Sequence, residues 1–240
     1  MNFTKTVLAL TVVFLFSCSA DETTPQKMYL KEIKDPSCFT EQYEYEAGRL
    51  TSFKRLFGEH VSTDTKFSYD ANLLKTVELR EDDGRVIIIE LSYGANGLPE
   101  RELRTSKNEE AESRLVSDHY YDKNGNLILT RRSYSDPNFF TSETEFEWAN
   151  GNIIRKHHFL INSQGNREFQ FSEDLFFDNK KNYTNQDFAF IYTGLESEGV
   201  LSRNNLIRKD MPYRYNKKGY PSGYNYRIDL ENYSVEMRYH

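Results

Sequence analysis

Cysteine is scarce in this chain: only Cys18 and Cys38 occur among its 240 residues. A framework of disulfide bonds is therefore excluded, and stability has to come from a hydrophobic core. Cys38 could act as a nucleophile only beside a positioned base, and the residues around it in the sequence identify no such partner. We therefore expect Cys38 to be a small buried residue near the first strand.

Long hydrophobic runs are also scarce. One such run, Val7–Phe16, follows the single cation Lys5 at the N-terminus. A helix over this run would extend about 15 Å, which is too short for a bilayer core that takes about 20 apolar residues. Residues 1–17 are therefore expected to be a signal peptide. The run ends in Leu15-Phe16-Ser17-Cys18, which resembles the lipobox of bacterial lipoproteins.

The lipobox resemblance implies cleavage before Cys18 and attachment of a diacylglyceryl group to its thiol. Residues 18–40 would then form a lipidated N-terminus and a flexible tether, and the protein would be anchored in the outer membrane through this lipid. The alternative is an ordinary secretory signal followed by an incidental cysteine. Asp21 and Glu22 come soon after Cys18, and they resemble the surface-export signal of Bacteroidota lipoproteins. A surface-exposed protein and a simple solvated tether both stay open.

Net charge is small, with a formal value of −6. This weak acidity argues against a nucleic-acid partner and against a polybasic membrane-binding face. Aromatic residues, by contrast, are abundant, with 17 Tyr and 17 Phe. Because disordered chains are poor in aromatics and tyrosine suits half-buried strands, this composition predicts a folded domain rich in β-structure.

One unit recurs along most of the chain. An aromatic residue is followed by Asp, Asn or a small residue, then by a turn with Gly or Asn, and then by an aliphatic or aromatic residue. Alternation before the turn, as in Lys66-Phe67-Ser68-Tyr69, is typical of a strand with one buried face. Because Asn and Gly tolerate positive φ, each unit predicts a β-hairpin. The motif aromatics are Tyr45, Tyr69, Tyr93, Tyr121, Trp148, Phe177 and Tyr215.

Units such as Tyr121-Asp122-Lys123-Asn124-Gly125-Asn126-Leu127 resemble the YD repeats of the Rhs-like group, and especially the shorter YD-like lipoproteins of Bacteroidota. Several copies lack the Asp or the Gly, so the chain resembles a divergent relative. The resemblance implies an all-β domain over residues 41–240. It implies a meandering antiparallel sheet of tandem β-hairpin repeats, twisted or curled into an open spiral or partial barrel. Many proteins of this kind have no known function.

Three stretches interrupt the repeats, and binding residues are expected on such loops. Ser106–Glu112 is polar, Ser135–Phe140 carries two phenylalanines, and Phe188–Leu195 could be a short helix or loop that covers one end of the sheet. The alternative is that the inserts only cap the sheet and the rings only form its core. The candidate binding residues are Trp148, Phe139, Phe140 and Tyr192.

No catalytic residue, cofactor or metal site is predicted. His157 and His158 are adjacent on a predicted strand, so their side chains point to opposite faces and cannot readily share one ion. The acidic runs Glu81–Asp83 and Glu109-Glu110 occupy turn-like positions where nothing would shift a carboxyl pKa. The sequence therefore predicts a protein that is not an enzyme.

The leading hypothesis is a membrane-anchored cell-envelope lipoprotein with a binding or scaffolding role, directed at a glycan or an envelope protein. A second hypothesis is an accessory protein of an Rhs-like toxin or envelope assembly system. A third is a hydrolase that uses loop carboxylates. Genes for glycan utilisation or for Rhs-like effectors beside this one would separate the first two.

Overall fold

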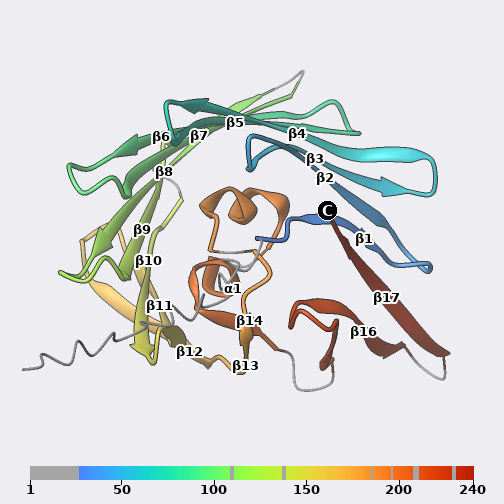
Figure 1. The fold of residues 1–240 in the computed structure, drawn as a ribbon. Coiled ribbons are helices and arrows are strands. Elements are labelled where there is room, and N and C mark those ends of the chain that lie inside the picture. The colour runs from blue at the N-terminus through green and yellow to red at the C-terminus, as the bar shows by residue number, and fades with distance from the viewer. Residues whose placement is uncertain are drawn as a thin grey trace, which may run out of the picture.

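A computed structural model describes residues 27–108, 111–136, 139–184, 186–195, 197–207, 211–228 and 231–240 (Figure 1). One antiparallel sheet of 15 strands dominates the fold, and two short strands pair separately. The expected all-β class is confirmed. The strands are β1 Leu30–Lys34, β2 Thr40–Glu46, β3 Arg49–Phe57, β4 His60–Asp70, β5 Leu73–Glu81, β6 Val86–Tyr93, β7 Pro99–Lys107, β8 Glu112–Tyr121, β9 Leu127–Tyr134, β10 Thr141–Ala149, β11 Asn152–Ile161, β12 Arg167–Asp174, β13 Phe177–Lys181, β14 Asn204–Leu206, β15 Tyr213–Tyr215, β16 Pro221–Ile228 and β17 Glu231–Tyr239.

The sheet is a meander with one long-range connection. Strands β1 to β12 follow one another in space as in sequence, and β17 returns to pair with β1. In this pair Ile33 lies opposite Met237. Strand β1 falls inside residues 18–40, which the sequence assigned to a tether. That boundary was wrong, because Leu30 and Ile33 are buried and their strand is held between β2 and β17.

The sheet curls because an irregularity recurs at the motif aromatics. Strand register shifts immediately before Tyr45, Tyr69, Tyr93, Tyr121, Trp148 and Tyr215. A β-bulge inserts one extra residue, bends its strand and increases the local twist. Repetition of this bulge in successive hairpins gives the open curl that Figure 1 shows. The expected partial barrel is thus built by the repeat itself.

The sixth copy of the motif is an exception to the hairpin prediction. Phe177 begins β13, which pairs with β14 across an intervening segment. That segment holds a 3₁₀ helix, η1 (Phe188–Thr193), and a short helix, α1 (Ser197–Leu201). Asp187 caps η1 by accepting a hydrogen bond from the backbone N–H of Ala189, and Gly194 ends it with a φ of 90°. We call residues 177–207 the insert.

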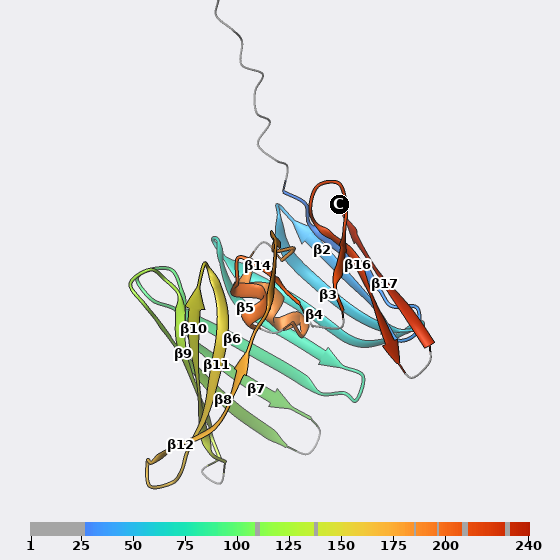
Figure 2. The ribbon, with the colours of Figure 1, turned by 90° about the horizontal axis from the view of Figure 1, so that it is seen from below.

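The insert fills the inside of the curl instead of covering one end of the sheet (Figures 1 and 2). Phe190 and Val200 of the insert are buried in one cluster with Tyr43, Phe53 and other inward residues of the sheet. A smaller cluster joins Leu127, Phe146 and Ile153 to the other side of the insert. The core therefore lies between the inner face of the sheet and the insert. In the part of the chain that is described, no helix is long and apolar enough to cross a membrane.

Candidate functional site

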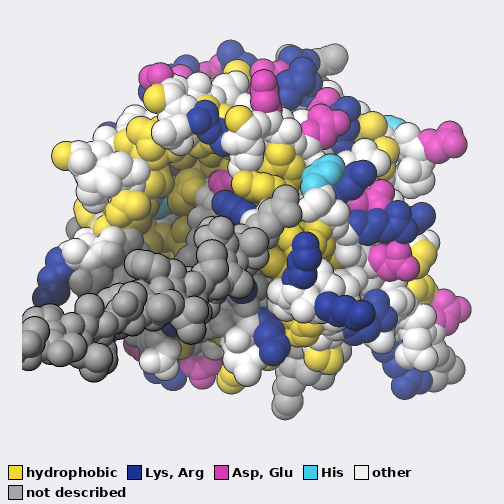
Figure 3. Space-filling view, viewed as in Figure 1, with side chains coloured by type: hydrophobic (Ala, Val, Ile, Leu, Met, Phe, Trp, Pro, Cys, Tyr) yellow, Lys and Arg dark blue, Asp and Glu magenta, His cyan; other side chains and the backbone are white. Residues whose placement is uncertain are grey.

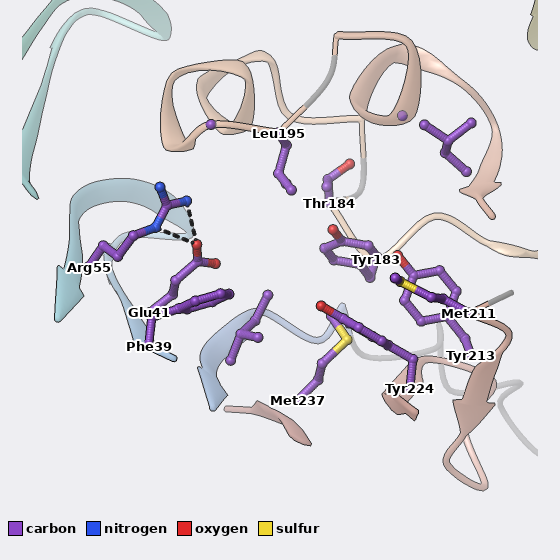
Figure 4. A pocket seen from close by; sticks show the side chains of 14 residues that line it. Phe39, Glu41, Arg55, Tyr183, Thr184, Leu195, Met211, Tyr213, Tyr224 and Met237 are labelled. Atoms are coloured by element: carbon purple, nitrogen blue, oxygen red, sulfur yellow. Dashed lines mark hydrogen bonds and ion pairs between the residues drawn. The ribbon is translucent and has the colours of Figure 1, made fainter. Parts of the chain in front are cut away.

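A cavity of about 310 Å³ lies where the first strands, the last strands and the insert meet (Figure 4). Phe39, Glu41 and Arg55 come from the β1–β3 side, and Tyr224 and Met237 come from β16 and β17. The pairing of β17 with β1 brings these two ends of the chain together. The volume of the cavity lies at the lower limit of cavities that hold small ligands. Tyr183, Thr184 and Leu195 line it from the insert.

One end of the cavity is formed by an ion pair between a buried glutamate and a half-buried arginine. Glu41 is 5% exposed, and Nε and Nη2 of Arg55 donate to its Oε1 at 3.0 and 2.6 Å. The hydroxyl of Tyr43 donates to Oε2 at 2.7 Å, and burial, with Glu41 adding to it, raises the pKa of Tyr43 well above its usual value. Nη2 of Arg55 also donates to the carbonyl of Thr193 on the insert. Both carboxylate oxygens are thus engaged, and the pair ties the sheet to the insert.

The opposite wall is aromatic and sulfur-rich. The rings of Tyr183 and Tyr213 meet edge to face at 6.2 Å between centroids, and those of Tyr213 and Tyr224 meet at 5.8 Å. Tyr183 is buried, and this burial raises its pKa well above the usual range. Met211 and Met237 complete the wall (Figure 4). Flat rings and adaptable thioethers fit an apolar face of a ligand, whereas the Glu41–Arg55 end is polar.

The sequence missed these cavity residues, although one signal was present. In β2 the alternation puts Glu41 on the same inward face as Tyr43. A glutamate at an inward position of a strand has to be paired, which pointed to an unusual site. No local pattern indicated that Arg55, from the next strand, would be its partner. The contribution of Tyr183 and Tyr224 depends on the insert and on the return of β16 and β17.

Four of the seven motif aromatics, Trp148 among them, share a structural role. Each donates a hydrogen bond to the backbone carbonyl just after the turn of the preceding repeat, which links successive hairpins. Trp148 also borders a second hollow of about 480 Å³ with Phe188 and Arg203. The bonds of this ladder run from Tyr69 to Leu50 (2.9 Å), Tyr93 to Leu74 (2.6 Å), Tyr121 to Pro99 (2.8 Å) and Trp148 Nε1 to Leu127 (2.8 Å).

The other three candidate aromatics lie in different environments. Phe139 and Phe140 are each 59% exposed, and Phe139 packs on Tyr134 with 5.0 Å between ring centroids. Tyr192 is buried in η1, and its hydroxyl donates to Oε2 of Glu102 at 3.0 Å. The four candidates therefore do not form one site. Cys18 lies outside the described residues, so its lipidation stays a prediction.

Further expectations about reactive residues have mixed outcomes. Cys38 is exposed, so its expected burial was wrong: it lies in the β1–β2 turn rather than on a strand. His157 bonds to Ser172 and Glu147, whereas His158 bonds to Thr144, as expected for opposite faces of β11. Within the described ranges, no three His, Cys, Asp or Glu side chains cluster in a way that could hold a metal.

Of the two acidic runs, the structure describes only Glu81–Asp83. Glu81 and Asp83 both form ion pairs with Arg85 at the turn between β5 and β6. The pair Glu109-Glu110 lies outside the described residues.

No family model matches the sequence, and no curated protein matches it. Among solved structures, the chain is similar to one described as a porin-like protein from Bacteroides uniformis. The TM-score is 0.46 at 11% sequence identity, and the match covers 89% of this chain and 95% of that chain.

Proposed function

We propose that this chain is a lipid-anchored, non-catalytic binding protein of the bacterial outer membrane. Its cavity would take a small ligand that has one flat apolar face and one polar edge, such as a neutral sugar ring. The observation that carries the proposal is the cavity between Glu41–Arg55 and the tyrosine wall. The resemblance of residues 1–18 to a lipoprotein signal supports the location.

The arrangement of the ion pair favours binding over catalysis. A general base needs a free oxygen within reach of a substrate proton. Both oxygens of Glu41 already accept hydrogen bonds, from Arg55 and from Tyr43. The Glu41–Arg55 pair can still accept or donate weak hydrogen bonds at the edge that faces the cavity, and these bonds would orient a bound ring. A glycan ligand agrees with the wall, because tyrosine presents a flat face and a hydroxyl together.

A panel of neutral mono- and oligosaccharides titrated calorimetrically into the full chain in a neutral detergent tests the proposal. Leu195→Trp places an indole at the cavity lining, and we expect it to weaken binding by at least about tenfold, equivalent to about 1.4 kcal/mol. Leu73→Trp is the matched control, because Leu73 is 40% exposed at the start of β5. Absence of sugar binding to the unmodified chain, or an equal loss in both variants, would refute the cavity proposal.

A further inference from the structure

After β6, polar and charged residues enter the inner face of the sheet beside the apolar cluster of Leu127, Phe146 and Ile153. On β6 the inward residues Ile87, Ile89 and Leu91 are buried in the main core. On β7 the residues opposite Ile89 and Leu91 are Arg104 and Glu102. Strands β8 to β12 extend past the insert at their far ends, as Figure 2 shows. Polar side chains therefore continue on the inner face beyond the region that the insert covers. Hydrophobic side chains also gather on the inner side of the curl, as Figure 3 shows.

A row of hydrogen-bonding side chains crosses β8 to β11 on this face. The register puts His119 opposite Thr130, and Thr130 opposite Thr144. His158 is opposite Thr144 on the next strand. Nδ1 of His119 lies 3.0 Å from Oγ1 of Thr130, and Nδ1 of His158 lies 3.2 Å from Oγ1 of Thr144. Nε2 of His119 is buried and has no hydrogen-bond partner among the described residues.

Arg132 lies at the centre of this surface. It follows Thr130 by two residues on β9 and so projects from the same face. Burial raises the pKa of Glu102 and lowers the pKa values of His119 and His158, and the charge of Arg132 is a further lowering influence on all three. Glu102, His119 and His158 belong to β7, β8 and β11. The guanidinium of Arg132 is therefore close enough to act electrostatically on side chains from three different strands.

The guanidinium of Arg132 is available to a ligand. Arg132 is exposed, and its side chain makes no hydrogen bond or ion pair with any described residue; the side chain of Arg104 makes none either. The neighbouring Arg131 projects from the outer face, where it donates to Glu143 at 2.6 Å. Adjacent arginines on one strand therefore differ: the outer one is held by a carboxylate, and the inner one is not.

Two exposed rings lie on the same face of the sheet as Arg132. Tyr134, two residues further along β9, is 46% exposed and packs on Phe139. Phe171 on β12 is 53% exposed and lies on the ring of His158 with 4.3 Å between centroids. Three strand spacings separate β9 from β12, which is about 14 Å. The two aromatic positions are thus too far apart for one small ring, and they suit an extended ligand.

We propose that this surface, the Arg132 patch (Arg104, His119, Arg132, Tyr134, His158 and Phe171), binds an acidic glycan, a chain of sugar rings that carries carboxylate or sulfate groups. Arg132 would pair with the anionic group through two parallel N–H donors, a geometry for which guanidinium is suited. Tyr134 and Phe171 would stack on two separate ring faces along the same glycan chain. This inference rests on the proposed binding role but uses a site separate from the cavity.

Polygalacturonate, chondroitin sulfate, uncharged dextran and inorganic phosphate, each titrated into the full chain in a neutral detergent, test the patch. We expect the two acidic polymers to bind and dextran to bind at least tenfold more weakly. Arg132→Gln should weaken acidic-polymer binding by at least tenfold, and Tyr134→Ala should weaken it severalfold. Arg114→Gln is the matched control, because it makes the same change of charge at an exposed residue of β8 on the outer face.

The outcomes separate this inference from the cavity proposal. Leu195→Trp should leave acidic-polymer binding unchanged, and Arg132→Gln should leave neutral-sugar binding in the cavity unchanged. Equal losses in Arg132→Gln and Arg114→Gln, or no binding of either acidic polymer, would overturn the patch while leaving the cavity standing. Binding of phosphate as tightly as the polymers would also overturn it, since the aromatic positions would then contribute nothing. Thermal unfolding of each variant controls for loss of fold.

Discussion

Removal of single tyrosine hydroxyls measures whether the motif aromatics hold the repeats together. In Tyr93→Phe the ring stays and only its 2.6 Å hydrogen bond to the carbonyl of Leu74 is lost. A hydrogen bond of this kind contributes about 1 kcal/mol to the free energy of unfolding. Because the hydroxyl is partly buried, the carbonyl cannot regain a full water partner. We expect Tyr93→Phe to lower the free energy of unfolding by about 1 kcal/mol, which for a chain of this size lowers Tm by about 2–4 °C.

Tyr45 provides the contrast within the same motif. It is the first aromatic of the series, and its buried hydroxyl has no hydrogen-bond partner among the described residues. Tyr45→Phe therefore removes an unsatisfied polar atom without breaking a bond. We expect this variant to be as stable as the unmodified chain, or more stable by about 1 kcal/mol. The two changes are chemically identical, and they differ only in the partner of the hydroxyl.

Urea unfolding followed by tyrosine fluorescence and far-ultraviolet circular dichroism compares the variants, with midpoints read at equal slope. We expect a lower midpoint for Tyr93→Phe and an unchanged or higher midpoint for Tyr45→Phe. Equal destabilisation of the two variants would refute this expectation, because the loss would then not depend on whether the hydroxyl has a hydrogen-bond partner.

Two further predictions concern a buried histidine and a strand glycine. Burial, with Arg132 adding to it and Asp118 opposing it, lowers the pKa of His119 to about 4. Because the unfolded chain then binds more protons than the folded chain, the free energy of unfolding should fall by about 2 kcal/mol between pH 7 and pH 5. Urea midpoints measured across this range should show the fall, and His119→Gln should remove the contribution of this histidine. Gly223 has a φ of 150°, and a Cβ there would collide with the carbonyl oxygen of Val235. Gly223→Ala should therefore cost about 2–4 kcal/mol in urea unfolding, and a loss below about 1 kcal/mol would contradict the close approach.

The local parts of the fold could be predicted from the sequence, because their signals are local. Alternation and turn residues within each repeat predict the hairpins around Tyr69 or Tyr121, and the structure confirms them. The bulge that recurs beside six of the motif aromatics has no compositional signal, so the mechanism of the curl could not be predicted. Phe177 carries the motif, but it does not form the predicted local hairpin. It begins β13, whose partner β14 is the distant segment Asn204–Leu206, and no local signal specifies that pairing.

The long-range parts could not be predicted. The pairing of β1 with β17 joins residues near opposite ends of the chain, and no local pattern specifies such a partner. The cavity depends on this pairing, because Met237 and Phe39 line it together. The Arg132 patch depends equally on register: only the alignment of four strands shows that His119 and His158 share a row. Sequence reasoning found exposed aromatic loops such as Phe139 but not the surface beside them.

The anchor is the claim on which the proposed location depends, and the mass of the mature protein tests it most directly. Intact-mass spectrometry of the chain extracted from bacterial membranes should show a protein that begins at Cys18 and carries the mass of a diacylglyceryl group, usually with one further acyl chain. The Cys18→Ser variant should lose that mass and leave the membrane fraction. A mature chain that begins at another residue, or a Cys18→Ser variant that stays in the membrane fraction, would contradict the account.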